Sequence, residues 1–488
     1  MPAVILSAVL QGVDALPVSV EVDISPGLPA VNIVGLPDVA VQEAKERMRS
    51  AIRQSGWEFP MRRITINLSP ADVKKVGTHF DLPMAVGILV ASGQLPAVLI
   101  RQKLFVGELT LEGRVLPIRG ATIFATVAQE KKYTCVVPTE NIHEVVICRE
   151  VDFATVGALS DLRQPLHMQR GQGPERPTKE RSLEHWSAIR GQAHAKRALV
   201  IACAGQHNLL MIGPPGSGKT MLSEAAAELL PNLSEARALE VQKIHSLRPR
   251  SATRNFWRPP FRHPHHSASL ASLVGGGSRL QPGEITFAHQ GVLFLDELPE
   301  FPRLHLEALR QPMEDGTITI SRVAGTVEYP ARPMIIAAMN PCPCGYAGDA
   351  KQPCVCTAQQ RQKYQQRLSG PLLDRFDMVV TVPRLPIRER QDKPAAVNDP
   401  RAEILLAQQA QARRKMANRD LRGRKLEQAV RLDEAASSFL LQAAERTHVS
   451  ARGYDRILRV ARTIADINEQ STVTVDHLAE ALMFRGSF

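Results

Sequence analysis

The sequence predicts a multidomain α/β protein that ends in a helical part. The middle of the chain alternates apolar, strand-like runs with helical segments, which is typical of a parallel sheet covered by helices. One such run, 208–212, leads into a glycine-rich loop and then into the helical stretch 221–230. In 450–468, apolar residues instead recur at the spacing of one helix face. We therefore expect a parallel-sheet core followed by packed helices.

Two polar stretches predict the boundaries between domains. With 488 residues, the chain is long enough for about three domains of roughly 100–200 residues each. Residues 161–182 and 386–400 are polar, contain several prolines and have no apolar period, so we interpret them as linkers. They divide the chain into a mixed α/β domain over 1–160, a sheet-containing core over 183–385 and a helical part over 401–488.

Composition and hydropathy argue against disordered, fibrous and membrane-spanning proteins. Hydrophobic residues make up 44% and charged residues 22% of the chain, close to the average for globular proteins. Residues 1–10 are apolar, but no basic residue precedes them and no cleavage site follows, so they predict a first strand rather than a signal peptide. The most apolar stretch, 80–100, is interrupted by polar residues and prolines. We expect a cytoplasmic protein with no membrane partner.

The chain is basic, and the excess of positive charge lies after residue 160. The formal net charge is +11. Residues 1–160 carry 15 Lys and Arg against 16 Asp and Glu, whereas residues 161–488 carry 45 against 33. Such an excess fits a polyanionic partner such as nucleic acid, although a solvated basic surface has the same composition.

The most specific motif is a phosphate-binding loop between the predicted strand and helix. It consists of Gly213, Pro214, Pro215, Gly216, Ser217, Gly218, Lys219 and Thr220. Backbone N–H groups in such a loop surround phosphate oxygens that side chains would otherwise block. Lys219 is expected to reach the β- and γ-phosphates and Thr220 to bind Mg²⁺. The motif therefore predicts ATP and Mg²⁺ as ligands.

Polar side chains follow two further predicted strands of the same core. The apolar run 292–295 ends in Asp296 and Glu297, and the run 334–339 ends in Asn340. At the sheet edge that holds the glycine loop, Asp296 can hold Mg²⁺ through water, Glu297 can polarise the attacking water and Asn340 can orient it. The alternative interpretation is an exposed strand end and a turn before a proline.

These residues, together with longer motifs, resemble the AAA+ ATPases of the clade that includes magnesium chelatase and the MCM helicases. Over all three parts, the chain is similar to the ComM/YifB family of competence-associated, magnesium-chelatase-like ATPases. The similarity is carried by GPPGSGKT, the insert 262–289, LFLDELPEF, LRQPMEDGTITISR, AMNPCPCG, SGPLLDRFD and SARGYDRILRVARTIAD. It implies an AAA+ P-loop core, a helical lid and a homo-hexameric ring.

The resemblance also implies roles for three residues around the phosphates. Asn340 is implied as the first sensor, Arg375 as the arginine finger offered to a neighbouring subunit's γ-phosphate, and Arg452 as the second sensor on the lid. An arginine supplied in trans stabilises the charge spread over the transferred phosphoryl group, and it requires an oligomer. Taken alone, each arginine is more often a surface residue.

A predicted hairpin and the insert supply the candidate DNA contacts. Within 316–329, alternating residues, a turn near 323–325 and a returning strand indicate two antiparallel strands. The family resemblance implies that this hairpin points into the pore of the ring. Arg322 near its tip and Arg279 in the glycine-rich insert are therefore candidates for contacting DNA phosphates. The alternative for each is a solvent-facing charge.

The first domain resembles the protease domain of Lon, which has a ribosomal S5-like fold. This chain has Met84 where Lon-type proteases carry the nucleophilic Ser, and Thr122 where they carry the Lys base. A thioether cannot act as the nucleophile, and a hydroxyl cannot replace an amine base. The resemblance therefore implies a retained fold without proteolysis.

Four of the seven cysteines form two Cys-x-Cys pairs in one segment. They are Cys342, Cys344, Cys354 and Cys356. Four thiolates can form a tetrahedral zinc site that fixes a long loop, although the gap within each pair is tighter than the usual two residues. Free thiols and a disulfide remain alternative interpretations. The histidines within 263–266 suggest a metal too, but they lack matching ligands nearby.

These observations favour a DNA motor over two other classes of protein. By the family resemblance, ATP hydrolysis in a hexamer drives a helicase or branch-migration activity on single-stranded or branched DNA, in recombination during natural transformation. The alternative is a chelatase-type ATPase that remodels a protein partner. The basic excess after residue 160 favours the DNA motor, whereas Met84 and Thr122 set an active peptidase aside.

Overall fold

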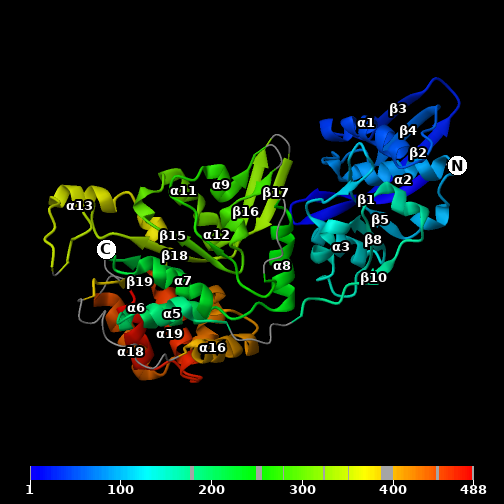
Figure 1. The fold of residues 1–488 in the computed structure, drawn as a ribbon. Helices are drawn as coiled ribbons and strands as arrows, with labels where there is room; N and C mark the ends of the chain where they lie inside the picture. Colours follow the sequence, from blue (N-terminus) through cyan, green and yellow to red (C-terminus); the bar gives the residue numbers. More distant parts are fainter. Residues whose placement is uncertain are drawn as a thin grey trace. The chain divides into compact units, whose positions relative to one another are not determined.

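The computed structural model of the chain consists of two compact units (Figure 1). The structure describes residues 2–175, 181–248, 255–277, 280–322, 325–349, 351–385, 399–446 and 450–485. One unit comprises Met1–Pro177 and Glu235–Trp257, and the other comprises Thr178–Ser234 and Arg258–Phe488. Within the described ranges, every helix is too short or too polar to cross a membrane.

The first unit is built on a mixed sheet with strand order β10-β9-β8-β5-β1-β2-β4-β3. Its strands are β1 (Ala3–Gln11), β2 (Asp14–Ser25), β3 (Ala30–Val34), β4 (Arg63–Ser69), β5 (Lys103–Phe105), β8 (Thr134–Pro138), β9 (Asp152–Val156) and β10 (Met168–Arg170). Between β5 and β8 in the sequence, β6 (Glu108–Leu109) and β7 (Val115–Leu116) form a short antiparallel hairpin. The helices of this unit are α1 (Val39–Gln54), α2 (Asp81–Ala91), α3 (Ala121–Glu130), α4 (Ile142–Val145) and α8 (Glu235–Ser246). The N-terminal residues form the expected first strand.

Part of the predicted linker 161–182 belongs to this sheet. β10 pairs antiparallel with β9, and Met168 lies opposite Ala154. A three-residue edge strand with no buried residue has the composition of a linker, which is why the sequence does not distinguish the two. Residues 176–180 of this stretch, and 386–398 of the second predicted linker, lie outside the described residues.

Helix α8 packs on the first unit although its sequence lies within the predicted sheet-containing core. The backbone N–H of Gly120, just before α3, donates to Ser246 O at 2.9 Å. Arg149 Nε donates to Glu235 Oε1 at 2.7 Å. The residues of α8 therefore belong to the first compact unit, although they lie within the segment 183–385.

The second unit contains the parallel sheet that the sequence predicts, with strand order β12-β15-β18-β11-β19. Its strands are β11 (Leu209–Ile212), β12 (Phe261–Arg262), β15 (Val292–Leu295), β18 (Met334–Met339) and β19 (Met378–Thr381). β15 and β18 are buried along their whole length. Parallel strands covered on both faces read as continuous apolar runs, which is the pattern of these segments.

Helices and two small hairpins surround this sheet. The helices are α5 (Glu184–Ala188), α6 (Ala193–Gly205), α7 (Lys219–Leu229), α9 (Leu270–Val274), α10 (Glu284–Phe287), α11 (Arg303–Ala308), α12 (Arg310–Glu314), α13 (Ala358–Gln365) and α14 (Gly370–Leu373). The hairpins are β13 (Gly275–Gly276) with β14 (Gln281–Pro282), and β16 (Thr317–Arg322) with β17 (Gly325–Pro330). The second hairpin confirms the one predicted within 316–329.

The C-terminal helices share a hydrophobic core with the parallel sheet. They are α16 (Arg401–Arg413), α17 (Gly423–Val430), α18 (Glu434–Arg446), α19 (Ala451–Ile467) and α20 (Val475–Met483). α6 packs against α16 and α19, as the ribbon shows (Figure 1). Arg459 Nη2 donates to Asp377 Oδ1 at 3.1 Å and thereby joins α19 to the residue just before β19.

Candidate active site

The glycine-rich loop connects β11 to α7 and leaves an open cradle at two of its glycines. Gly216 (φ 72°) and Gly218 (φ 96°) have the left-handed backbone that favours glycine. A Cβ added at either residue would meet no atom within 4 Å, so this part of the loop has room for a ligand. Gly213, in contrast, lies so close to β19 that an added Cβ would be 2.2 Å from Val382 O. The loop is thus packed on the sheet at its start and open at its centre.

Lys219 lies at the start of α7, with its ammonium group inside the loop. Its Nζ donates to Gly213 O (2.7 Å), Pro214 O (3.0 Å) and Asn340 Oδ1 (3.3 Å). Burial lowers the pKa of Lys219, whereas the carboxylates of Asp296 and Glu297 act in the opposite direction. A partly desolvated ammonium at a helix N-terminus is suited to binding phosphate.

Pairing in the parallel sheet brings the predicted polar residues to one edge. β18 pairs with both β15 and β11, so the ends of three strands lie next to each other. Thr220 Oγ1 donates to Asp296 Oδ2 at 3.4 Å. Together with the contact between Lys219 and Asn340, this hydrogen bond brings together four of the predicted residues from three segments of the chain. Hydroxyl and carboxylate oxygens are hard donors that fit Mg²⁺.

Glu297 follows Asp296 and has a partner that the sequence does not single out. His266 Nδ1 lies 3.3 Å from Glu297 Oε2, and the glutamate side chain is 53% exposed. The strand register explains why His266 lies near Glu297. Arg262 of β12 lies opposite Leu293 of β15, and the histidine and the glutamate each follow four residues after their strand residue. The His-Pro-His-His run is visible in the sequence, but only this register shows which carboxylate it meets.

Comparisons with known proteins match the chain over nearly its whole length. The family described as magnesium chelatase, subunit ChlI, matches residues 185–390, and two related descriptions, subunit ChlI of Mg-chelatase and the ChlI C-terminal region, match 20–141 and 396–485. Competence protein ComM of Haemophilus influenzae is 41% identical over 497 residues, covering 99% of this chain and 97% of the relative. The protein YifB of Salmonella typhimurium is 43% identical over 495 residues, with 99% and 97% coverage. The chain belongs to the ComM/YifB family of magnesium-chelatase-like proteins. YifB of Escherichia coli is also 43% identical, over 484 residues.

The ComM/YifB resemblance assigns roles to two further arginines. Both lie apart from the hydrogen bonds that join the phosphate loop to Asp296 and Asn340. Arg375 follows α14, and its guanidinium donates to Pro371 O at 2.5 Å and pairs with Glu314. Arg452 is exposed in the first turn of α19. Lys219, Thr220, Asp296 and Asn340 are therefore brought together within one chain, whereas Arg375 and Arg452 are not part of that contact set.

The candidate DNA-binding residue Arg322 lies on one of two hairpins that contact each other in this ComM/YifB chain. Arg322 is exposed at the end of β16, and its Nη2 lies 3.7 Å from the position that a Cβ on Gly276 would take. Tyr329 of β17 donates from its hydroxyl to Leu280 O at 2.7 Å. Arg279, between β13 and β14 in the sequence, lies outside the described residues.

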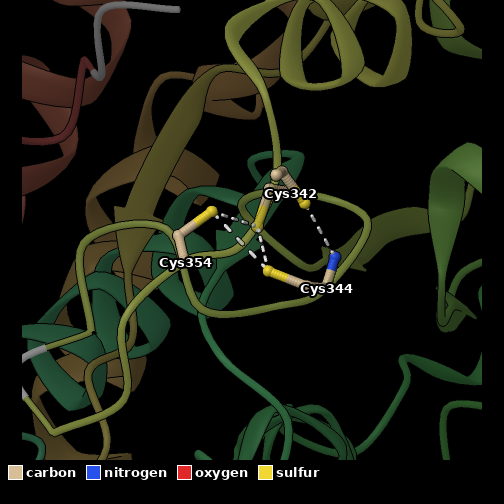
Figure 2. Close-up of side chains that lie close together, drawn as sticks. Cys342, Cys344 and Cys354 are labelled. Carbon is tan, nitrogen blue, oxygen red and sulfur yellow. Dashed lines mark hydrogen bonds between the residues drawn. The ribbon is translucent and has the colours of Figure 1, made fainter.

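The four predicted cysteines converge in the loop that follows β18. Their sulfur atoms all lie within 4.8 Å of one another, and Figure 2 shows those of Cys342, Cys344 and Cys354 pointing toward each other. Three of the sulfur pairs are 3.3–3.6 Å apart, and all four residues are free thiols. A backbone hydrogen bond from Tyr346 lowers the pKa of Cys344 to about 6, which favours its thiolate. In the described part of the chain, these four cysteines are the one cluster of three or more His, Cys, Asp or Glu side chains that could hold a metal ion.

Proposed function

We propose that this member of the ComM/YifB family is an ATP-hydrolysing motor that acts on DNA as a homo-hexameric ring. The observation that carries the ATPase is the pair of contacts at one sheet edge, Lys219 with Asn340 and Thr220 with Asp296. These contacts join the phosphate loop to the residues that follow β15 and β18. The family match to magnesium chelatase subunits supports the same assignment.

Each residue at this edge has a separate task in the proposed reaction. The loop N–H groups and Lys219 bind the β- and γ-phosphates of ATP. Thr220 and Asp296 would hold Mg²⁺, which when bound neutralises charge on the phosphates. Glu297 polarises the attacking water and Asn340 orients it. In the described structure, His266 lies against one carboxylate oxygen of Glu297, and the glutamate side chain remains open to water.

We propose a hexamer because Arg375 and Arg452 do not take part in the contacts around the phosphate loop of their own chain. Arg375 is paired with Glu314 rather than with the phosphate loop. We propose that in the ring it reaches the γ-phosphate bound by a neighbouring subunit, and that the C-terminal helices form a lid on which Arg452 is the second sensor. A guanidinium placed in this way stabilises the charge of the transition state.

The first unit is proposed to keep the Lon-type, S5-like fold without proteolytic activity. Met84 is fully buried in α2. Thr122 is fully buried in α3, where its hydroxyl donates to Glu144 O at 3.1 Å. Neither side chain presents a nucleophile or a base to a peptide.

DNA is proposed as the partner because of the charge distribution and the position of Arg322. Residues 161–488 carry 45 Lys and Arg against 33 Asp and Glu. Arg322 and the insert that contains Arg279 meet at adjoining hairpins. The Haemophilus influenzae relative is named a competence protein, which fits a role in handling DNA. The second candidate function is an ATPase that remodels a protein partner, and the match to magnesium chelatase subunits supports it.

We expect DNA binding to weaken steeply as salt rises. Each phosphate contact releases condensed counterions and contributes about −0.9 to the slope of log K against log salt. Arg322→Ala should reduce the magnitude of this slope by about 1 and weaken binding about equally for unrelated sequences. Fluorescence anisotropy with labelled single-stranded and forked DNA, in the presence of a non-hydrolysable ATP analogue, measures both quantities.

The matched control for this experiment is Arg101→Ala, an exposed arginine in the near-neutral N-terminal part of the chain. It should leave affinity and slope unchanged. Undetectable or salt-independent DNA binding by the wild-type protein would instead support the protein-remodelling alternative.

We also propose that the four cysteines bind one structural Zn²⁺. Four sulfur atoms at about 2.3 Å from a tetrahedral Zn²⁺ lie about 3.8 Å from one another. The described thiols are already within 4.8 Å, so small side-chain rotations complete the site. Binding replaces the thiol protons, which pass to solvent.

A further inference from the structure

We propose that the four-cysteine site is a positioning element of the ATPase: with Zn²⁺ bound, it fixes the loop that sets Asn340 and Pro215 against the phosphates. This inference rests on the proposed ATPase, but the metal content of the site is measured independently of ATP turnover. Three observations carry it.

The first observation is the short covalent path from the cysteines to the site. β18 ends at Met339, Asn340 follows, and Cys342 is only two residues further on. Cys342 is fully buried, and its sulfur accepts from Ala347 N at 3.3 Å. Any shift of Cys342 is therefore transmitted to Asn340, whose amide oxygen accepts from Lys219.

The second observation is direct contact between the cysteine loop and the phosphate loop. Gly345 has φ 87°, and a Cβ there would lie 2.7 Å from Pro215 Cδ and 4.0 Å from Asn340 Cγ. The turn between the two cysteine pairs thus packs on Pro215 without an intervening side chain. Gly345 N donates to Cys342 O at 2.9 Å, which ties this turn to the first cysteine.

The third observation is that Arg384 also connects the same two loops. Its Nη2 donates to Pro215 O at 3.4 Å, and its guanidinium lies 5.6 Å from the centre of the Tyr346 ring. Its Nε is 3.9 Å from Asp349 Oδ2, and the Asp349 side chain is almost completely buried. The cysteine loop therefore holds the phosphate loop at Pro215 through two separate sets of contacts.

The loop buries little apolar surface. Most residues in the described part of 343–357 are exposed or half-buried, and Val355 is 82% exposed. A segment with so little apolar burial gains its fixed shape from a cross-link, and a metal bound by four thiolates supplies one. Misplacing a positioning group by about 1 Å costs roughly 100-fold in rate, so loosening the loop should slow turnover.

The test compares metal content, ATP binding and turnover in the full-length protein. Wild-type protein should carry about one zinc per chain, and its Co²⁺-substituted form should show the absorption of tetrahedral thiolate coordination. Cys354→Ser should lose the metal and lower kcat roughly 10- to 100-fold, while the Kd for a fluorescent ATP analogue changes much less. Cys354→His, which supplies another zinc ligand, should keep the metal and recover most of kcat.

The matched control is Cys135→Ala, a buried free thiol in the first unit, which should keep both zinc and kcat. Removing zinc from wild-type protein with a chelator and adding it back tests the inference on an unaltered chain, in case Cys354→Ser does not fold. Zinc-free protein with wild-type kcat would overturn the positioning role. Wild-type protein that binds neither zinc nor Co²⁺ would overturn the metal site itself. An ATPase-inactive wild-type protein that still binds one zinc would contradict the proposed function and not the metal site.

Discussion

Glu297→Gln is expected to bind ATP and to hydrolyse it roughly 10²–10⁴-fold more slowly than the wild-type protein, the usual effect of losing a general base. The amide keeps the size of the side chain but cannot polarise the attacking water. Lys219, Thr220 and Asp296 are unchanged, so phosphate binding is retained. Steady-state ATPase rates and the Kd for a fluorescent ATP analogue separate the two effects.

Glu300→Gln is the matched control for this variant. Glu300 lies three residues further along the chain and pairs with Arg367 at 2.8 Å. It should retain wild-type turnover. Wild-type turnover in Glu297→Gln would show that another group polarises the water.

Arg375→Ala and Lys219→Ala should each abolish most turnover, and mixing them should restore part of it. An arginine finger contributes about 10³–10⁵-fold to kcat, so the loss in Arg375→Ala is large. In a mixed ring, Arg375 from a Lys219→Ala subunit can face an intact phosphate loop on an Arg375→Ala subunit. ATPase activity measured across a range of mixing ratios should pass through a maximum above both parents.

The control for this mixture is the double variant Lys219→Ala with Arg375→Ala. Mixed with the Arg375→Ala protein, it offers no interface that has both an arginine and an intact loop, so no recovery is expected. If native mass spectrometry shows that mixed rings form and activity never exceeds the parents, the role of Arg375 in trans is wrong.

The parallel sheet and the phosphate loop could be predicted because their signals are local. Strands buried on both faces read as continuous apolar runs, and the glycine loop connects one of them to a helix. Asp296 and Asn340 could be placed at the same edge because parallel strands end there together. The sequence therefore predicts most of the contact set around Lys219.

The remaining features depend on contacts between segments that are distant in sequence. The partnership of His266 with Glu297 follows from the register of β12 and β15, which no local pattern reveals. The spacing of the cysteines predicts a cluster, but not that Gly345 beside them packs on Pro215. The association of α8 with α3 likewise depends on tertiary packing alone.

The proposed ATP-driven action on DNA is tested most directly by the ATPase rate of the protein with and without DNA. The full-length protein should be assayed alone and with single-stranded, forked and duplex DNA at two salt concentrations, with Glu297→Gln as the blank. Single-stranded or forked DNA should raise the rate at low salt, and the increase should shrink at high salt because counterion release drives binding. An ATPase rate that no form of DNA changes at either salt concentration would contradict the DNA motor and favour the remodelling of a protein partner.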